Sequence, residues 1–170
     1  MRQFLVYLTT IFIMTTIRAN AQNTAFEKDA QTIDALIKAS YEVVSGEKGA
    51  KRQWERDRYL HHPQAVYSYF DKEKGKQVTV SLDAFHQATD KMVFNTAFYE
   101  SEVKREVRVF GNIAQVWSTY ETRLEEDGKV ERRGINSIQL VYENNRWYIV
   151  SWVFCGENES NIIPRTFDRN

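Results

Sequence analysis

The sequence predicts an α+β fold, in which about three helices lie on one face of a long, curved antiparallel sheet. Up to about residue 95 the apolar residues recur mostly with a helical period, interrupted by one short hairpin. From residue 98 onward they alternate with polar residues, which is typical of strands. Helices followed by a long run of strands favour an α+β layout with the helices on one face of the sheet.

Three segments in the first half carry helix signals. Residues 29–44 place their apolar side chains on one helical face. Residues 50–60 form a short polar helix that ends before Pro63, because proline lacks an amide hydrogen and restricts the residue before it. The third helix begins after Ser81, a typical N-cap residue, and runs to about Asn95.

The strands are separated by turn signals. Residues 65–70 and 76–81 alternate and flank the turn-like "DKEKGK", so we expect a hairpin. Four longer strands follow, and their turns are expected at Gly111-Asn112, Asp127-Gly128 and Asn144-Asn145. These residue types tolerate the positive φ of tight hairpins, so consecutive strands are antiparallel.

The order helix, short helix ending in "LHHPQA", hairpin, helix and four strands resembles the nuclear transport factor 2-like superfamily. The segments "FYESEV", "GNIAQVWSTYETR", "RGINSIQLVY" and "RWYIVS" are similar to its bacterial SnoaL-like branch, and the resemblance covers about residues 28–155. It implies a cone with an internal pocket and a dimer formed through the sheet. Members include ketosteroid isomerases, polyketide cyclases, dehydratases and non-catalytic binding domains, so the fold alone selects no function.

The first 21 residues have the layout of a secretory signal peptide. Arg2 precedes an apolar stretch at residues 4–17, and Ala19-Asn20-Ala21 supplies small residues for cleavage. We therefore expect residues 22–170 to form one exported domain, periplasmic or extracellular, with no membrane association after cleavage. A membrane anchor is the alternative, but the apolar stretch is short and diluted by four threonines.

Composition and motifs exclude several functional classes. The formal charge is +0 and no basic tract occurs, which argues against a nucleic-acid partner. No phosphate-binding loop or dinucleotide motif is present, so no cofactor is expected. No metal site is expected either, because the adjacent His61 and His62 point apart and the sequence has no H-x-x-x-H pair.

Two-residue turns at Asp127-Gly128 and Asn144-Asn145 would fix how the last three strands pair. One sheet face would then be apolar near the last hairpin and polar toward the other end. The apolar members of this face are Ile138, Leu140, Trp147, Ile149 and Val153. We expect the face to line the pocket, with ligand-binding residues Trp117, Thr119, Asn136 and Ser151.

The opposite sheet face would carry Ser137, Gln139, Tyr148, Val150, Trp152 and Phe154. That set is too aromatic for a face exposed to water, so we expect a homodimer through this outer face, with Trp152 near its centre. A pairing shift of one residue would exchange the two faces.

Asp57 and His61 are the candidate catalytic residues. Their spacing of four places a carboxylate and an imidazole on one helical face, which is a standard acid–base arrangement. The same spacing is also common in ordinary helix pairs. Glu100 and Glu102 share one strand face, either as a solvated charged stripe or as carboxylates at the pocket.

The sequence favours an exported protein that binds a small ligand, with no catalysis assigned. The alternative is a cofactor-free acid–base isomerase, cyclase or dehydratase acting on a small apolar substrate, and a third possibility is an interaction module. A buried carboxylate with a shifted pKa in the pocket would favour the enzyme. A wholly apolar pocket would favour binding alone.

Overall fold

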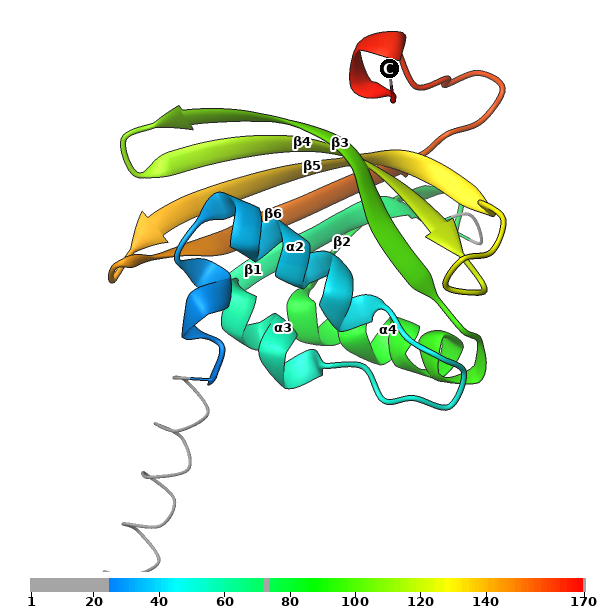
Figure 1. The fold of residues 1–170 in the computed structure, drawn as a ribbon, viewed down its shortest axis with the longest axis horizontal. Helices are drawn as coiled ribbons and strands as arrows, with labels where there is room; N and C mark the ends of the chain where they lie inside the picture. The colour runs from blue at the N-terminus through cyan, green and yellow to red at the C-terminus, as the bar shows by residue number, and fades with distance from the viewer. Residues whose placement is uncertain (1–24, 72–73, 170) are drawn as a thin grey trace, which may run out of the picture.

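The computed structural model describes residues 25–71 and 74–169. The predicted signal peptide and its cleavage site lie outside the described residues. Six strands form one curved sheet in the order β2-β1-β6-β5-β4-β3, and three α-helices pack against its inner face (Figure 1). The predicted α+β cone is confirmed. Among the described residues, no helix is long and apolar enough to cross a membrane.

The helices lie close to the predicted segments. A short 3-10 helix, η1 (Glu27–Ala30), precedes α2 (Ile33–Val44), and α3 (Trp54–Leu60) and α4 (Leu82–Asn95) follow. The Ser81 hydroxyl accepts a hydrogen bond from the Ala84 amide at 3.3 Å and caps α4, as a serine at this position predicts. The apolar face of α2 is buried in the core under the sheet.

The strands are β1 (His61–Asp71), β2 (Lys76–Ser81), β3 (Tyr99–Phe110), β4 (Ile113–Arg123), β5 (Arg132–Glu143) and β6 (Arg146–Gly156). Neighbours run antiparallel except β1 and β6, which run parallel. The turn between β5 and β6 is the predicted one, with φ angles of 51° at Asn144 and 62° at Asn145.

The predicted pairing of β4 with β5 is wrong by one residue. Residues 124–131 connect these strands as a longer loop instead of a two-residue turn, and Ser118 pairs with Asn136. Because side chains alternate along a strand, this shift turns Trp117 and Thr119 to the outer face of the sheet.

A bulge in β6 makes the predicted orientation of Ser151 wrong as well. Val150 has no partner in β5, because Leu140 pairs with Ile149 while Gln139 pairs with Ser151. One extra residue on one strand reverses the side-chain alternation beyond it. Ser151 therefore faces outward, against the prediction.

Trp152 and Phe154 consequently lie on the inner face. Trp152 is buried, and its ring meets the Tyr41 ring of α2 edge-on, with centroids 6.0 Å apart. The prediction that Trp152 anchors an outer interface is wrong, because its own helices cover it. The homodimer itself stays a prediction.

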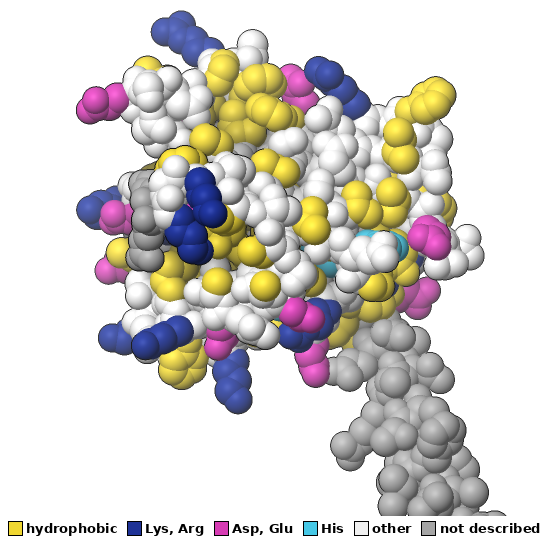
Figure 2. Space-filling model, turned by 180° about the vertical axis from the view of Figure 1, so that it is seen from behind, with side chains coloured by type: hydrophobic (Ala, Val, Ile, Leu, Met, Phe, Trp, Pro, Cys, Tyr) yellow, Lys and Arg dark blue, Asp and Glu magenta, His cyan; other side chains and the backbone are white. Residues whose placement is uncertain are grey.

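The C-terminal segment, residues 157–169, crosses the outer face of the sheet, opposite the helices (Figure 1). The Thr119 hydroxyl donates a hydrogen bond to the Phe167 carbonyl at 2.6 Å, and the Trp117 ring lies 5.9 Å from the Phe167 ring. This segment thus covers part of the face that was expected to meet a second subunit. Hydrophobic side chains gather beside it (Figure 2), and the exposed ones are Phe70, Val153 and Ile162.

Candidate functional site

A cavity of about 250 Å³ lies between the inner sheet face and the helices. A large part of its wall is aromatic, formed by Trp54, Tyr67, Tyr69, Phe85, Phe98, Tyr120, Trp152 and Phe154. Some of these rings stack on one another: the Tyr67 and Phe85 centroids are 4.1 Å apart, and the Tyr69 and Phe154 centroids 5.4 Å apart. Such a wall suits a small molecule with an apolar body.

A row of polar side chains crosses one end of the cavity. Glu100 of β3 pairs with Thr122 of β4, Thr122 pairs with Arg132 of β5, and all three line the cavity. Neighbouring strands lie about 4.8 Å apart, so the backbones at Glu100 and Arg132, two strands apart, are separated by roughly 10 Å. A polar end of a ligand would meet both groups.

Glu100 is the titratable group of this row. Burial raises the pKa of Glu100 to about 7, although a hydrogen bond from Asn136 and the charge of Arg132 act in the opposite direction. A carboxyl group with this pKa can take or release a proton near neutral pH. Of the two alternatives open from the sequence, a charged surface stripe or a pocket carboxylate, Glu100 takes the second.

Asn136 is held by a directed chain of hydrogen bonds. The Ser118 hydroxyl donates to Glu102, so the Tyr41 hydroxyl, 2.7 Å from Ser118, must donate to it in turn. Tyr41 then accepts from Asn136 Nδ2 at 3.0 Å. Arg105 holds the far end, with Nη2 2.7 Å from the Glu102 carboxylate. The chain fixes the orientation of the Asn136 amide beside Glu100.

Tyr120 occupies space that Gly134 leaves free. A Cβ atom at Gly134 would lie 2.5 Å from the Tyr120 hydroxyl and 2.4 Å from the Cys155 carbonyl oxygen. Burial, followed by the charge of Glu100, raises the pKa of Tyr120 to about 12. The Tyr120 hydroxyl therefore keeps its proton and can donate a hydrogen bond at this wall of the cavity.

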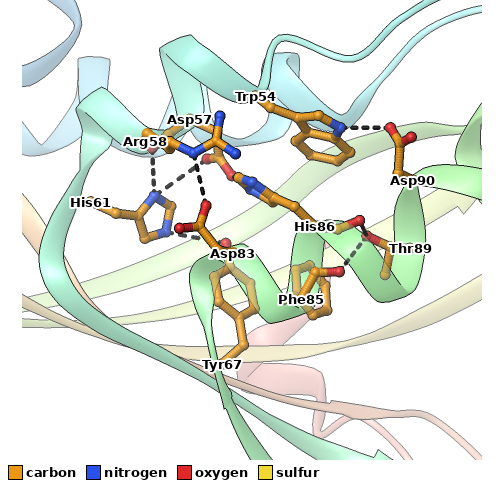
Figure 3. Close-up of polar contacts among 10 residues, drawn as sticks. All are labelled: Trp54, Asp57, Arg58, His61, Tyr67, Asp83, Phe85, His86, Thr89 and Asp90. Carbon is orange, nitrogen blue, oxygen red and sulfur yellow. Dashed lines mark hydrogen bonds and ion pairs between the residues drawn. The ribbon is translucent and has the colours of Figure 1, made fainter.

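A second cluster is buried behind the aromatic wall, around Asp57 of α3 (Figure 3). One carboxylate oxygen of Asp57 lies 2.7 Å from Nε2 of His86 in α4, and the other lies 3.3 Å from Nδ1 of His61. The predicted contact of Asp57 with His61 is confirmed, although His61 begins β1 and is not helical. The His86 ring stacks on Trp54, with centroids 4.2 Å apart.

The orientation of His61 follows from its neighbours. Its Nδ1 lies 2.8 Å from the Asp57 carbonyl oxygen and also faces the Asp57 carboxylate, and both can only accept. Nδ1 therefore carries a hydrogen, and when the ring is uncharged Nε2 accepts a hydrogen bond from the Tyr67 hydroxyl at 3.1 Å. A hydrogen-bonded chain thus joins Asp57 to Tyr67, whose ring lines the cavity.

Asp57 stays ionised in this cluster. Burial alone would raise the pKa of Asp57, but the charge and hydrogen bond of His61 and the hydrogen bond of His86 outweigh it and lower this pKa to about 2. The cluster ties α3, α4 and β1 together. No group of three or more His, Cys, Asp or Glu side chains within the described residues is placed to hold a metal ion.

The four predicted ligand-binding residues separate in the structure. Asn136 lines the cavity. Trp117, Thr119 and Ser151 lie on the outer face, because of the loop before β5 and the bulge in β6. The catalytic role of Asp57 and His61 stays a prediction, and in the structure they reach the cavity wall through Tyr67.

Sequence comparisons give no match: no family model and no curated protein matches the chain. Solved structures do match in fold. A protein of unknown function with a cystatin-like fold from Nostoc punctiforme covers 75% of this chain and 90% of its own, at 13% identity and a TM-score of 0.60. A protein of unknown function from Silicibacter pomeroyi, described as NTF-2 like, covers 74% and 92%, at 18% identity and a TM-score of 0.53. The fold is that of the nuclear transport factor 2-like proteins.

A third structure that matches in fold is that of a candidate ketosteroid isomerase from Parabacteroides distasonis. It covers 76% of this chain and 91% of its own, at 16% identity and a TM-score of 0.53. Structural matches at identities this low establish the fold alone. The chemistry has to be inferred from the side chains of this chain.

Two functional candidates were absent from the sequence analysis. His86 meets Asp57 across 29 positions, and no local spacing signals such a contact. Tyr120 was not a candidate, because the predicted register, with Trp117 and Thr119 on the inner face, placed Tyr120 on the outer face. With the loop at residues 124–131 taken into account, the alternation of side chains along β4 places Tyr120 on the same face as Thr122, the partner of Glu100.

Proposed function

We propose that the protein is a cofactor-free enzyme that moves a proton on a small, largely apolar molecule, with Glu100 as the acid–base residue. The observation that carries this proposal is a carboxyl group in the cavity wall whose pKa is raised to about 7 by burial. The small volume and aromatic wall of the cavity support a compact substrate of one or two rings or a short chain.

The reaction class is isomerisation or dehydration. The ionised carboxylate of Glu100 takes a proton from a carbon next to a carbonyl group of the substrate. The protonated carboxyl then returns that proton to another carbon, or passes it to a hydroxyl group that leaves as water. Neither outcome needs an electron acceptor, and Glu100 ends each cycle as it began.

Charge that develops on the substrate carbonyl oxygen needs hydrogen-bond donors. Tyr120 is suited to this task, because its hydroxyl stays protonated and lies in the same wall as Glu100. Arg132 adds a positive charge at the same end of the cavity. Asn136 acts as a positioning residue for Glu100.

Hydrogen–deuterium exchange tests the proposal without knowledge of the natural substrate. Cyclopentanone and cyclohexanone in heavy water should exchange their α-hydrogens faster with the protein than in buffer, as followed by proton NMR. The rate should rise with pH around a midpoint near 7, as Glu100 ionises. Glu100→Gln should abolish the acceleration, whereas Glu106→Gln, on the exposed face of the same strand, should retain it.

Binding without chemistry is the second candidate, favoured by the stacked aromatic wall. Trp152 lines the cavity, so its fluorescence should respond to a small apolar ligand. A fluorescence response to the cyclic ketones without any exchange would replace the enzymatic proposal by the binding one. An unchanged exchange rate in Glu100→Gln would contradict the role of Glu100.

The place of action forms part of the proposal. The signal-peptide pattern of residues 1–21 supports export to the periplasm or the medium. N-terminal sequencing of those fractions should find a chain that begins at Gln22. A chain there that begins at Met1 would contradict export by cleavage.

A further inference from the structure

A broad groove of about 760 Å³ lies outside the cavity, between α3, the start of β1 and the turn from β5 to β6. It shares no lining residue with the cavity. Its charged and polar lining comprises Glu55, Arg58, His61, His62, Glu143 and Arg146. The proposed acid–base chemistry uses none of these side chains directly.

Arg146 is the unusual member of this lining. It is only 8% exposed, and its guanidinium lies between two rings, 3.6 Å from the Tyr59 centroid and 4.1 Å from the Tyr148 centroid. Nη2 donates a hydrogen bond to the Tyr59 carbonyl oxygen, and Nε is buried without a partner. Within the described part of the chain, Arg146 bonds to the Tyr59 carbonyl, and no carboxylate forms an ion pair with it.

A buried guanidinium with one hydrogen bond is incompletely satisfied. Its five N–H groups ordinarily meet carboxylate or carbonyl oxygens, since removing the charge from water is costly. The two tyrosine rings compensate part of that cost by cation–π contact. They also fix the plane of the guanidinium, so its free edge is already oriented for a planar anion.

The other basic side chains of the groove have partners elsewhere. Arg58 is ion-paired with Asp83 at 2.8 Å. His62 Nδ1 accepts a hydrogen bond from the Gln64 amide at 3.1 Å. Arg146 is therefore the arginine of this lining that has no anionic partner among the described residues.

We propose that this groove binds a carboxylate-bearing ligand through the guanidinium of Arg146. A planar carboxylate with a single charge matches the planar guanidinium in the bidentate manner. Glu143 also lines the groove and would repel a doubly charged phosphate more strongly than a carboxylate. The rings of Tyr59 and Tyr148 favour a ligand whose carboxylate is attached to an apolar or aromatic body.

Solution NMR on ¹⁵N-labelled protein tests this site. Benzoate is the probe, benzyl alcohol is its uncharged counterpart, and inorganic phosphate is the competing anion, all at constant ionic strength. Benzoate should shift the Arg146 Nε–H signal in a saturable manner, and benzyl alcohol should not. Arg146→Gln should weaken benzoate binding about tenfold or more, measured on the amide signals of Tyr148 and His62.

Matched variants separate loss of the site from loss of the fold. Arg58→Gln removes a charge from the same groove and should leave benzoate binding within about twofold, since Arg58 is already paired. If Arg146→Gln does not fold, Arg146→Lys keeps the charge and loses the planar fork, and it should still weaken binding. Equal shifts by benzyl alcohol, stronger binding of phosphate, or no saturable shift would each overturn the proposal.

Discussion

Asn136 Nδ2 donates a hydrogen bond to the Tyr41 hydroxyl at 3.0 Å and so joins β5 to α2 across 95 positions of the chain. Asn136 is 1% exposed and Tyr41 is 5% exposed, so this contact is sealed from water. The same amide bonds to Glu100 and lowers its pKa against the effect of burial. One side chain therefore links the fold to the titration of the proposed catalytic group.

Replacing Asn136 tests both roles. Asn136→Leu should lower the free energy of unfolding by about 1–3 kcal/mol, because the Tyr41 hydroxyl loses a buried partner. It should also raise the pH midpoint of ketone exchange, because Glu100 loses the hydrogen bond that favours its ionised form. Urea unfolding and the pH profile measure the two effects. Gln139→Leu, on the outer face of the same strand, is the control and should change neither.

Gly134 is expected to tolerate no side chain. Gly134→Ala places a Cβ 2.4 Å from the Cys155 carbonyl oxygen and 2.5 Å from the Tyr120 hydroxyl. The resulting overlap should cost about 1–3 kcal/mol of stability and displace the Tyr120 hydroxyl. Its cross-strand partner Gly156 has its nearest contact at 3.8 Å, so Gly156→Ala should cost less than half as much. Equal losses in urea unfolding would contradict the close packing at Gly134.

The inner face of β5 was predictable, because the alternation of side chains along a strand places Asn136 and Leu140 on the same side. The inward-facing residues of β4 and β6 could not be predicted in this way. The Asp127-Gly128 pair is a typical hairpin turn, yet it lies inside an eight-residue loop. The bulge at Val150 has no glycine or proline beside it to signal it, so the sequence does not reveal the extra residue in β6.

The site was predictable to the extent that it is local. Asp57 and His61 are four residues apart, so a helical spacing indicates their contact, and Glu100 shares a strand face with Glu102. The contact of Asp57 with His86 depends on how α3 and α4 pack against each other. Burial, which raises the pKa of Glu100, is likewise a tertiary property that spacing does not encode.

Asp57 should make the protein sensitive to acid. Its pKa in the folded protein, about 2, lies below the ordinary value of 3.8, so its ionised form stabilises the fold above about pH 4. That stabilisation, roughly 2 kcal/mol, is lost as the pH falls through about 2. Asp57→Asn should remove this dependence and lower stability at pH 7 by at least about 2 kcal/mol.

Urea unfolding at pH 7, 4, 3 and 2.5 measures the effect. Asp83→Asn is the matched control, because Asp83 joins the same two helices through Arg58 in an exposed ion pair. It should cost less than about 1 kcal/mol. Equal losses in the two variants at pH 7 would show that burial of the Asp57 cluster contributes nothing beyond a surface pair.

The predicted homodimer now depends on a different set of residues. Three exposed apolar side chains, Phe70, Val153 and Ile162, at 56%, 39% and 72% exposure, surround one groove on the outer face beside the C-terminal segment. A two-fold pairing would cover this patch in both subunits at once. Val153→Glu should then shift sedimentation from dimer to monomer while thermal stability stays unchanged. Trp152→Glu should instead prevent folding, because it buries a charge among Tyr41 and Tyr67. A wild-type protein that sediments as a monomer at high concentration, or a Val153→Glu variant that stays dimeric, would rule out this interface.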